Sequence, residues 1–346
     1  MIKELMFEGN NRSFDKTVCL GLEISEDDIK SLCDKLKQVA INNTYYDKAK
    51  KEIKNVTKQQ LLSWGLLTER DGKILPTNGY AILTGNNMLP NTIQCGVFKG
   101  TTKAVFVDRR EYSGFLTEQI EQAYDFILRN IHLGAEFNGL YRQDEYEIPR
   151  DAIRELIINA AVHRSYLDNG NIQIAIYDNR LEITSPGKLP INQSIEKMKE
   201  GYSKIRNEAL ACAFSYMGLI EHWGSGIPRI INMLKEAGLA EPEFIGGDTE
   251  LRINIYRSGH KTANETLISK SNGKRIANSD YYYKNCIINY LASAGKASKQ
   301  QIENAISDEY LKSLDKTLRS NKIRYWLQQL KNKKVLKIEG RTWSIL

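Results

Sequence analysis

The stretch Asp151-Ala-Ile-Arg-Glu155-Leu-Ile-Ile-Asn159-Ala-Ala-Val-His163 predicts a helix that carries a carboxylate and an amide one turn apart. A step of four residues turns an α-helix through about 400°, so Glu155 and Asn159 project from one face and can meet one ligand together. The apolar residues of this stretch recur at the spacing of a helix packed on a core. They are Ile153, Leu156, Ile157, Ala160 and Ala161.

The opposite face of this predicted helix also carries Ile158 and Val162. Apolar β-branched residues beside a carboxylate and an amide are unusual on a solvent-facing surface, so we expect something to cover them. One interpretation is a ligand or a lid over the polar pair. The other is a second layer of protein, with Glu155 and Asn159 capping or pairing nearby groups.

Glycine-bearing turns follow the helix at Gly187 and at Gly224 to Gly226, and with it they make up three characteristic stretches. These stretches are Ile148–Tyr166, Ile174–Pro190 and Arg206–Ile230. Together they resemble the divergent Bergerat (GHKL-type) ATP-binding domain of bacterial transcriptional regulators and RecG-like helicase-related proteins. The resemblance implies such a domain over residues 146–257.

The resemblance also implies roles for single residues. Asn159 would ligate a Mg²⁺ ion that bridges the nucleotide phosphates, and Glu155 would orient a water or act as the catalytic base. Gly187 would lie in the first glycine box, where a missing Cβ lets the backbone approach the adenine. Gly224, Ser225 and Gly226 would form the second box, whose amides face the phosphates. ATP and Mg²⁺ are therefore the expected cofactors.

Two departures from the family pattern argue against fast ATP turnover. The first glycine box normally supplies an Asp to the adenine amino group, and Ser185 stands in its place here. Only 36 residues separate Gly187 from Gly224, which leaves little room for a long ATP lid. We therefore expect nucleotide binding with at most weak hydrolysis.

Composition and length limit the class of protein. A chain of 346 residues with 41% hydrophobic and 26% charged residues is typical of a soluble protein with two or three cores. The uncharged apolar stretch Ala209–Ile220 is too short for a membrane span, and the start lacks the apolar core of a signal peptide. The five cysteines are scattered without a C-x-x-C pair, so they indicate neither a disulfide framework nor a zinc site. A cytoplasmic protein is expected.

The positive charge of the chain is concentrated in its last segment. Residues 281–346 hold 13 Lys or Arg against 5 Asp or Glu, a balance of +8, whereas the rest of the chain holds 36 against 37. Such a segment favours a polyanionic partner, of which nucleic acid is the usual one. The alternative is a solvated lysine-rich surface that keeps the protein soluble.

The same segment has the pattern of a winged helix-turn-helix. Helices are predicted at Asp280–Leu291, Ser298–Ile306 and Ser320–Lys331, and two strands at Val335–Glu339 and Arg341–Ile345. Winged helices bind DNA or dock on proteins, and the charge balance favours double-stranded DNA. Because winged-helix regulators often use two-fold DNA sites, a homodimer is compatible with this interpretation.

The third of these helices would be the one that reads DNA. Its inward stripe is Ile323, Leu327 and Leu330, which leaves amides, an aromatic ring and cations on the outer face. Such groups suit contacts with base edges and phosphates. The candidate DNA-binding residues are Asn321, Lys322, Arg324, Tyr325, Gln328, Gln329, Lys331, Lys337 and Arg341.

The sequence thus predicts a multidomain α+β chain that contains a Bergerat-like α/β sandwich and a C-terminal winged helix-turn-helix. Its expected segments are a helical part at 1–60, a small α/β domain at 61–145, the Bergerat-like domain at 146–257, a linker at 258–279 and the winged helix at 280–346. Relatives in the resembled family begin with a Schlafen/AlbA-type domain that this sequence lacks. Residues 1–60 are therefore expected to be the remnant that follows it.

Three functions remain open. The first is a nucleotide-responsive, DNA-binding transcriptional regulator, which we favour. The second is an ATP-hydrolysing enzyme that uses Glu155 and Asn159. The third is a module that docks on proteins. A helicase motor is not supported, because none of the 24 glycines begins a G-x-x-x-x-G-K-[ST] phosphate-binding loop.

Overall fold

The computed structural model describes most of the chain. The described residues are 7, 13–44, 46–89, 91–138, 141–221, 224–257, 284, 287–288, 290–291, 294–306, 316–332, 335–340 and 342–345. They belong to two compact units, Met1–Lys261 and Thr262–Leu346, and each unit is described by itself. The expected linker at 258–279 lies outside the described residues.

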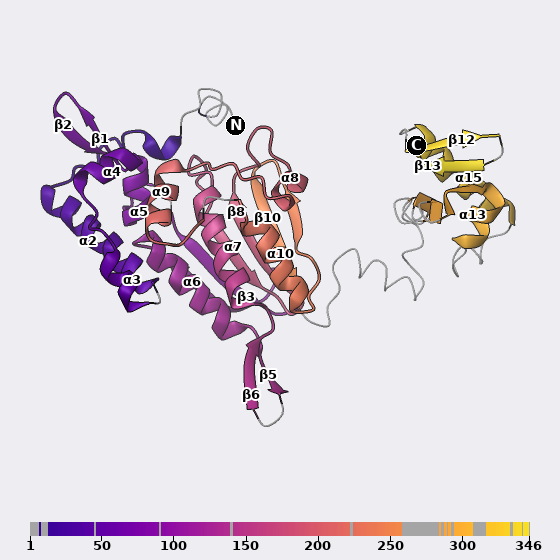
Figure 1. Cartoon of the computed structure of the whole chain (residues 1–346), viewed down its shortest axis with the longest axis horizontal. Helices are drawn as coiled ribbons and strands as arrows, with labels where there is room; N and C mark the ends of the chain where they lie inside the picture. The colour runs from indigo at the N-terminus through magenta and orange to yellow at the C-terminus, as the bar shows by residue number, and fades with distance from the viewer. Residues whose placement is uncertain are drawn as a thin grey trace. The chain divides into compact units, whose positions relative to one another are not determined.

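A six-stranded sheet forms the centre of the first unit (Figure 1). Its strands, in spatial order, are β4 (Phe106–Tyr112), β3 (Ile93–Phe98), β7 (Ile172–Ile176), β8 (Arg180–Pro186), β10 (Glu250–Tyr256) and β9 (Glu243–Gly246). β3 and β7 are parallel, and the other neighbouring strands are antiparallel. This mixed sheet and its helices confirm the predicted α+β class.

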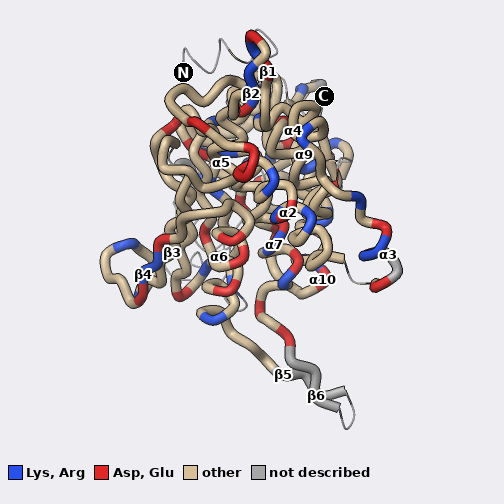
Figure 2. Tube along the Cα trace, turned by 90° about the vertical axis from the view of Figure 1, so that its left-hand side faces the viewer, with Lys and Arg blue, Asp and Glu red and all other residues tan. Residues whose placement is uncertain are grey.

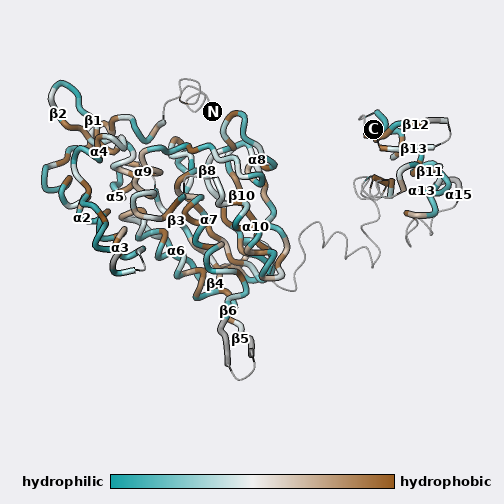
Figure 3. Tube along the Cα trace, in the orientation of Figure 1, coloured by the Kyte–Doolittle hydropathy of each residue, from teal (hydrophilic) through white to brown (hydrophobic). Residues whose placement is uncertain are grey.

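Three helices cover one face of the sheet. They are α6 (Leu116–Asn130), α7 (Arg150–His163) and α10 (Gly226–Glu236), and α7 contacts both of the others (Figure 1). The predicted inward stripe of α7 is confirmed, because Ile153, Leu156 and Ile157 are fully buried. The hydrophobic residues, brown in Figure 3, concentrate along this helix and the strands beneath it.

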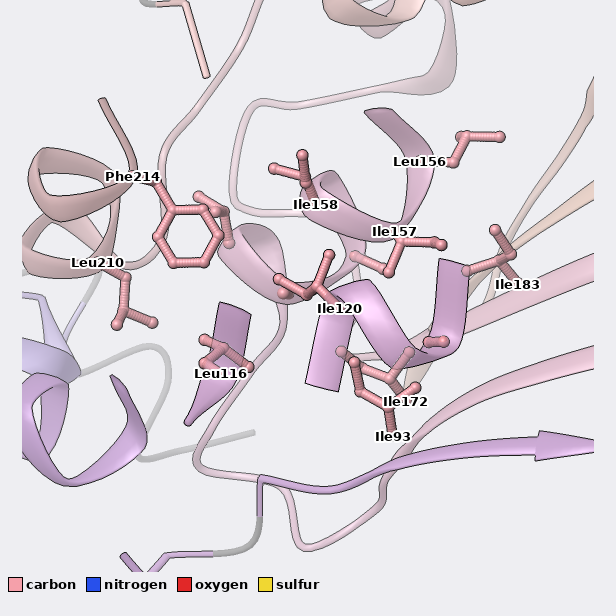
Figure 4. Packing of buried hydrophobic residues seen from close by; sticks show 14 of the residues in the cluster. Ile93, Leu116, Ile120, Leu156, Ile157, Ile158, Ile172, Ile183, Leu210 and Phe214 are labelled. Atoms are coloured by element: carbon pink, nitrogen blue, oxygen red, sulfur yellow. The ribbon is translucent and has the colours of Figure 1, made fainter. Parts of the chain in front are cut away.

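A second protein layer covers the opposite face of α7. Ile158 is fully buried and belongs to the same core cluster as Leu210 and Phe214 of α9 (Glu208–Tyr216), towards which it points in Figure 4. The Val162 carbonyl accepts a hydrogen bond of 2.7 Å from Asn207 Nδ2. Of the two interpretations given for these apolar residues, the covering protein layer is therefore the one that the structure has.

The N-terminal part of the first unit is largely helical. Its elements are the 3₁₀ turn η1 (Phe14–Lys16), α2 (Glu26–Asn42), α3 (Asp47–Glu52), α4 (Lys58–Trp64), the hairpin β1 (Leu67–Arg70) and β2 (Lys73–Pro76), and α5 (Asn78–Thr84). Ser25 caps α2 and exchanges hydrogen bonds with Asp28 in a capping box. Figure 2 shows both basic and acidic residues along α2 and α7, whereas α6 is mainly acidic.

The start of the described chain caps a helix that lies far away in the sequence. Ser13 Oγ donates to Arg206 O at 2.8 Å and accepts from Glu208 N at 3.3 Å. Asp15 Oδ2 accepts from Leu210 N at 3.0 Å. These acceptors satisfy N–H groups in the first turn of α9, which have no partner within the helix. Burial raises the pKa of Asp15, against the lowering effect of its hydrogen bond with Ser13.

The expected segments 1–60, 61–145 and 146–257 all fall in the first unit and share one hydrophobic core. β3 and β4 come from the second of these segments, yet they continue the sheet of β7 to β10. A hairpin of β5 (Leu133–Asn138) and β6 (Tyr141–Tyr146), which the sequence analysis did not predict, lies between α6 and α7. Pairing across a sheet is a long-range contact, so local sequence patterns did not show where one core ends.

The described part of the second unit contains three strands and two helices whose limits lie within it. They are β11 (Lys296–Ser298), α13 (Lys299–Ala305), α15 (Lys316–Asn332), β12 (Leu336–Glu339) and β13 (Thr342–Ile345), and the strands pair antiparallel in the order β11-β13-β12. The predicted stripe of Ile323, Leu327 and Leu330 is buried, together with Trp326. Residues 307–315, where the turn between the second and third helices was expected, lie outside the described part.

Within the described residues, no helix combines the length and the apolar character that crossing a lipid bilayer requires.

Candidate functional site

A cavity of about 190 Å³ lies against the C-terminal half of α7 in the first unit. Its walls come from α7, from β8, from the loop that contains α8 (Ile195–Lys199), and from the start of α10. Six of the residues named from the sequence line it: Glu155, Asn159, Ser185, Gly187, Gly224 and Gly226. The seventh, Ser225, is the N-cap residue of α10. The structure thus brings all the nucleotide candidates to one place.

The cavity combines an apolar floor with polar groups at its edge. Ile183 and Ile253 contribute from neighbouring strands, and Val162 from α7. The cations Lys188 and Lys204 lie on the loop side. Small-molecule sites commonly pair a mostly apolar lining with a few convergent polar groups that orient the ligand.

The carboxylate of Glu155 is buried and engaged by two neighbours. Arg229 Nη2, from the first turn of α10, donates to Glu155 Oε2 at 3.0 Å. Asn159 Nδ2 donates to Glu155 Oε1 at 3.4 Å. This second contact directs the amide nitrogen of Asn159 towards Glu155 and turns its Oδ1 in the other direction. The sequence placed Glu155 and Asn159 on one face, and the structure adds that they form a hydrogen-bonded pair.

The amino-terminal end of α10 packs closely against Glu155 and Asn159. A Cβ built on Gly226 would come within 2.5 Å of Glu155 Oε1 and 3.3 Å of Asn159 Nδ2. Any side chain at this position would displace the carboxylate. The absence of a side chain at Gly226 therefore lets the start of α10 pack directly against the α7 pair, and the amino-terminal end of a helix suits an anion.

Gly187 and Gly224 are required by contacts within the protein. Both have positive φ, 111° and 69°, which most residues avoid. A Cβ on Gly187 would come within 2.1 Å of the Arg206 guanidinium, and a Cβ on Gly224 within 2.1 Å of the Gly201 carbonyl oxygen. The glycines hold the loops that form the cavity wall close together, independently of any ligand.

Ser185 stands on β8 with its side chain 8% exposed. Its Oγ donates to the Ala160 carbonyl at 2.8 Å. Because the hydroxyl proton is used there, the oxygen can only accept a further hydrogen bond. Ser185 therefore offers an acceptor to a donor group in the cavity, such as an exocyclic amine.

His163 ends α7 and lines the cavity as a neutral imidazole. Burial lowers its pKa to about 4, the charge of Arg206 acts in the same direction, and a hydrogen bond with the Lys204 backbone opposes both. At neutral pH the imidazole therefore carries no charge. It adds a polar group to the cavity without adding a cation.

The residues fit a Mg²⁺–nucleotide by the chemistry of their donors. Mg²⁺ in nucleotide sites usually takes one or two protein oxygens and completes its shell with water and phosphate, so Asn159 Oδ1 suffices as a protein ligand. Ser185 can accept a hydrogen bond from an amino group such as that of adenine, and the amino-terminal end of α10 suits phosphates. The cavity volume is below the roughly 300–1,000 Å³ of most small-molecule sites.

A preformed metal cluster is not part of this arrangement. Among the described residues, no group of three or more His, Cys, Asp or Glu is arranged to hold a metal ion. A metal at this site would therefore depend on the phosphates for most of its ligands.

Comparison with known proteins supports an ATPase-like domain in the first unit. Residues 169–255 match an HATPase-type family model described as "Putative ATP-dependent DNA helicase recG C-terminal". The match covers less than half of the chain. It includes β7 to β10 and the glycines at 187, 224 and 226, and it begins after Glu155 and Asn159. The chain thus contains a divergent GHKL- or HATPase-like domain.

A solved structure has a similar fold over nearly the whole chain. It is the crystal structure of the DIP2311 protein from Corynebacterium diphtheriae, with a TM-score of 0.55 and 17% sequence identity. The alignment covers 99% of this chain and 66% of that protein, so this chain spans about two thirds of the length of its structural relative. At this identity the likeness concerns the fold alone. No curated protein matches the chain.

Two functional residues were missed by the sequence analysis. Arg229 lies 74 positions after Glu155, and Glu221, which accepts from Arg229 Nη1 at 3.5 Å, belongs to the loop before α10. No local spacing connects them with the α7 pair. The one available signal was the position of Arg229 just after the second glycine box, at the start of a helix.

The candidate DNA-binding residues of the second unit lie on α15 and β12. The exposed ones are Asn321, Arg324, Tyr325, Gln328, Lys331 and Lys337, while Lys322 and Gln329 are half-buried. Arg341 lies outside the described residues. Lys284 sits over the Tyr325 ring at 5.8 Å, which adds a cation to the same surface.

Proposed function

We propose that this protein is a nucleotide-responsive DNA-binding regulator. Its first unit would bind a Mg²⁺–nucleotide in the cavity beside α7, and its second unit would bind double-stranded DNA. The proposal rests on one observation: Glu155, Asn159 and the amino-terminal end of α10 line the same cavity. A nucleotide offers both groups that this arrangement suits, a base for the apolar floor and phosphates for the helix start.

Regulation is favoured over catalysis for a physical reason. An attacking water needs a carboxylate that is free to accept its proton, but Glu155 is bound by Arg229 and Asn159. A bound nucleotide would supply the phosphates to which Mg²⁺ binds, and Asn159 Oδ1 would hold that ion in place. Weak ATP hydrolysis by Glu155 is the alternative function.

The nucleotide site is tested by thermal unfolding. Millimolar ATP with Mg²⁺ should raise the melting temperature of the wild type, because a ligand that binds only the folded state stabilises it. Asn159→Ala should lose most of that shift, since it removes the protein ligand of the ion. Asn169→Ala, at an exposed position outside the cavity lining, is the matched control and should retain it. A wild type without any shift would count against the nucleotide site.

The DNA-binding part of the proposal rests on the charge and exposure of α15. We propose that the winged-helix pattern of the second unit presents this helix to the major groove, with β12 and β13 as the wing. The support is the three-stranded antiparallel sheet beside α15 and the +8 balance of residues 281–346.

Fluorescence anisotropy with duplex DNA tests this part. Binding should weaken steeply with salt, because each phosphate contact releases counterions. The triple variant Lys322→Ala, Arg324→Ala and Lys331→Ala should lower the affinity at least about tenfold at low salt and reduce the salt slope. A control variant with Lys30, Lys54 and Lys73 changed to Ala loses the same charge from exposed positions of the first unit and should bind normally.

The protein-docking function makes the opposite prediction. A wild type that binds no duplex even at low salt, where phosphate contacts are strongest, would favour docking on a protein over binding to DNA.

A further inference from the structure

We propose that Arg229 is the residue through which the cavity distinguishes nucleoside triphosphates from diphosphates, by exchanging Glu155 for the terminal phosphate. This inference rests on the proposed nucleotide site. It adds a specificity-determining residue on α10 that neither the α7 pair nor the glycine turns indicate.

Arg229 holds the start of α10 against the α7 pair. Its guanidinium bridges two carboxylates, Glu155 at 3.0 Å and Glu221 at 3.5 Å. Its backbone N–H donates to Ser225 O at 2.9 Å, so it belongs to the first turn of the helix. The ion pair with Glu155 therefore ties the start of α10 to α7 beside the cavity, which Glu155, Glu221 and Gly226 line.

The two partners differ in their contact with solvent. The side chain of Arg229 is 46% exposed, whereas that of Glu155 is 9% exposed. A half-exposed arginine remains hydrated on one side and can change partner without crossing the protein interior. Giving up the ion pair leaves the buried Glu155 carboxylate with the Asn159 hydrogen bond and without its cation, so the new contact of Arg229 with a phosphate must be the stronger one.

A phosphate is a stronger partner for Arg229 than a carboxylate. The guanidinium fork matches two phosphate oxygens, and a terminal phosphate carries more negative charge than Glu155. The amino-terminal end of α10 suits an anion as well and adds to the attraction. A triphosphate that reached this turn would compete successfully for Arg229, whereas a diphosphate would end short of it.

The exchange would also change the state of Glu155. While it is paired with Arg229, the carboxylate is neutralised by a cation and is a poor proton acceptor. After the exchange the carboxylate keeps the hydrogen bond from Asn159. Arg229 would thus couple recognition of the third phosphate to the loss of its ion pair with Glu155.

Isothermal titration with ATP and with ADP, each with excess Mg²⁺, tests the inference. Arg229→Gln should weaken ATP binding roughly tenfold or more and ADP binding much less, so the ratio of the two affinities should fall towards one. Arg229→Lys keeps the charge without the fork and should give an intermediate ratio. Glu241→Gln breaks the ion pair with Lys199, outside the cavity lining, and is the matched control, with a ratio near that of the wild type.

Glu155→Gln gives a result that a merely structural role of Arg229 would not produce. Because this variant frees Arg229 from its competing carboxylate, it should bind ATP more tightly than the wild type and leave ADP binding nearly unchanged. The double variant with Arg229→Gln should lose that gain. The Glu155→Gln measurement also decides the matter if Arg229→Gln does not fold.

The outcomes separate the two proposals. A wild type that binds neither nucleotide overturns the proposed function and this inference with it. A wild type that binds both, with Arg229→Gln lowering the two affinities equally or Glu155→Gln weakening ATP binding, overturns the inference and leaves the nucleotide site standing.

Discussion

His163 is the cavity residue whose titration the surroundings alter most clearly. Its pKa falls from an ordinary value near 6.5 to about 4 in the folded protein, chiefly through burial. Between these two values the unfolded chain binds a proton that the folded protein does not. The free energy of unfolding should therefore fall as the pH drops from 6.5 towards 4.

Urea unfolding at a series of pH values measures this effect. His163→Asn should flatten the decline between pH 6.5 and pH 4, because the altered residue no longer titrates. His132→Asn, at an exposed position outside the cavity, should retain the slope. An unchanged slope in the His163 variant would contradict a neutral, buried imidazole at this position.

Single residues also show how far a sequence can be interpreted without a structure. Glu155 and Asn159 were identifiable because helix periodicity places them on one face, which is a local property. The partner of Glu155 was not identifiable, since Arg229 reaches it only through the packing of α10 on α7. Similarly, the hydrogen bond that fixes Ser185 as an acceptor crosses from β8 to α7.

Among the elements, the helices were predicted better than the strands. The inward stripes of α7 and α15 followed from the 3.6-residue period, and the structure buries both. β4 (Phe106–Tyr112) lies at the edge of the sheet, where one side has no strand to fix its register. The short β11 has three residues, too few for alternation to reveal it.

Trp326 gives a test at the scale of one helix. It is 1% exposed on α15 and lies in the core of the second unit, which is separate from the core of the first. Trp326→Ala should destabilise that unit by about 3–5 kcal/mol through the cavity it leaves. In calorimetry it should lower one unfolding transition and leave the transition of the first unit in place.

The neighbouring Tyr325 is the control for this experiment, because it is 51% exposed on the same helix. Tyr325→Ala should leave both transitions nearly unchanged. A loss of stability that spread to both units in the Trp326 variant would contradict the independence of the two cores.

At the scale of the whole molecule, the chain consists of a unit that contains the HATPase-like domain and a smaller, basic unit. The sequence analysis predicted this division from the charge balance, but it also expected boundaries near residues 60 and 145. The structure instead extends one core from Ile29 to Ile255, because β3 and β4 complete the sheet on which α7 rests. The strands that support the candidate site therefore come from two stretches of sequence that looked like separate domains.

The central claim is that the cavity beside α7 binds a nucleotide through Mg²⁺. Titration of the wild type with ATP in the calorimeter, with Mg²⁺ and then with EDTA, tests it most directly. We expect saturable binding at one site with Mg²⁺, and we expect EDTA or Asn159→Ala to weaken it roughly tenfold or more. Binding that is absent at millimolar ATP, or that is equally strong without the ion and without Asn159, would contradict it.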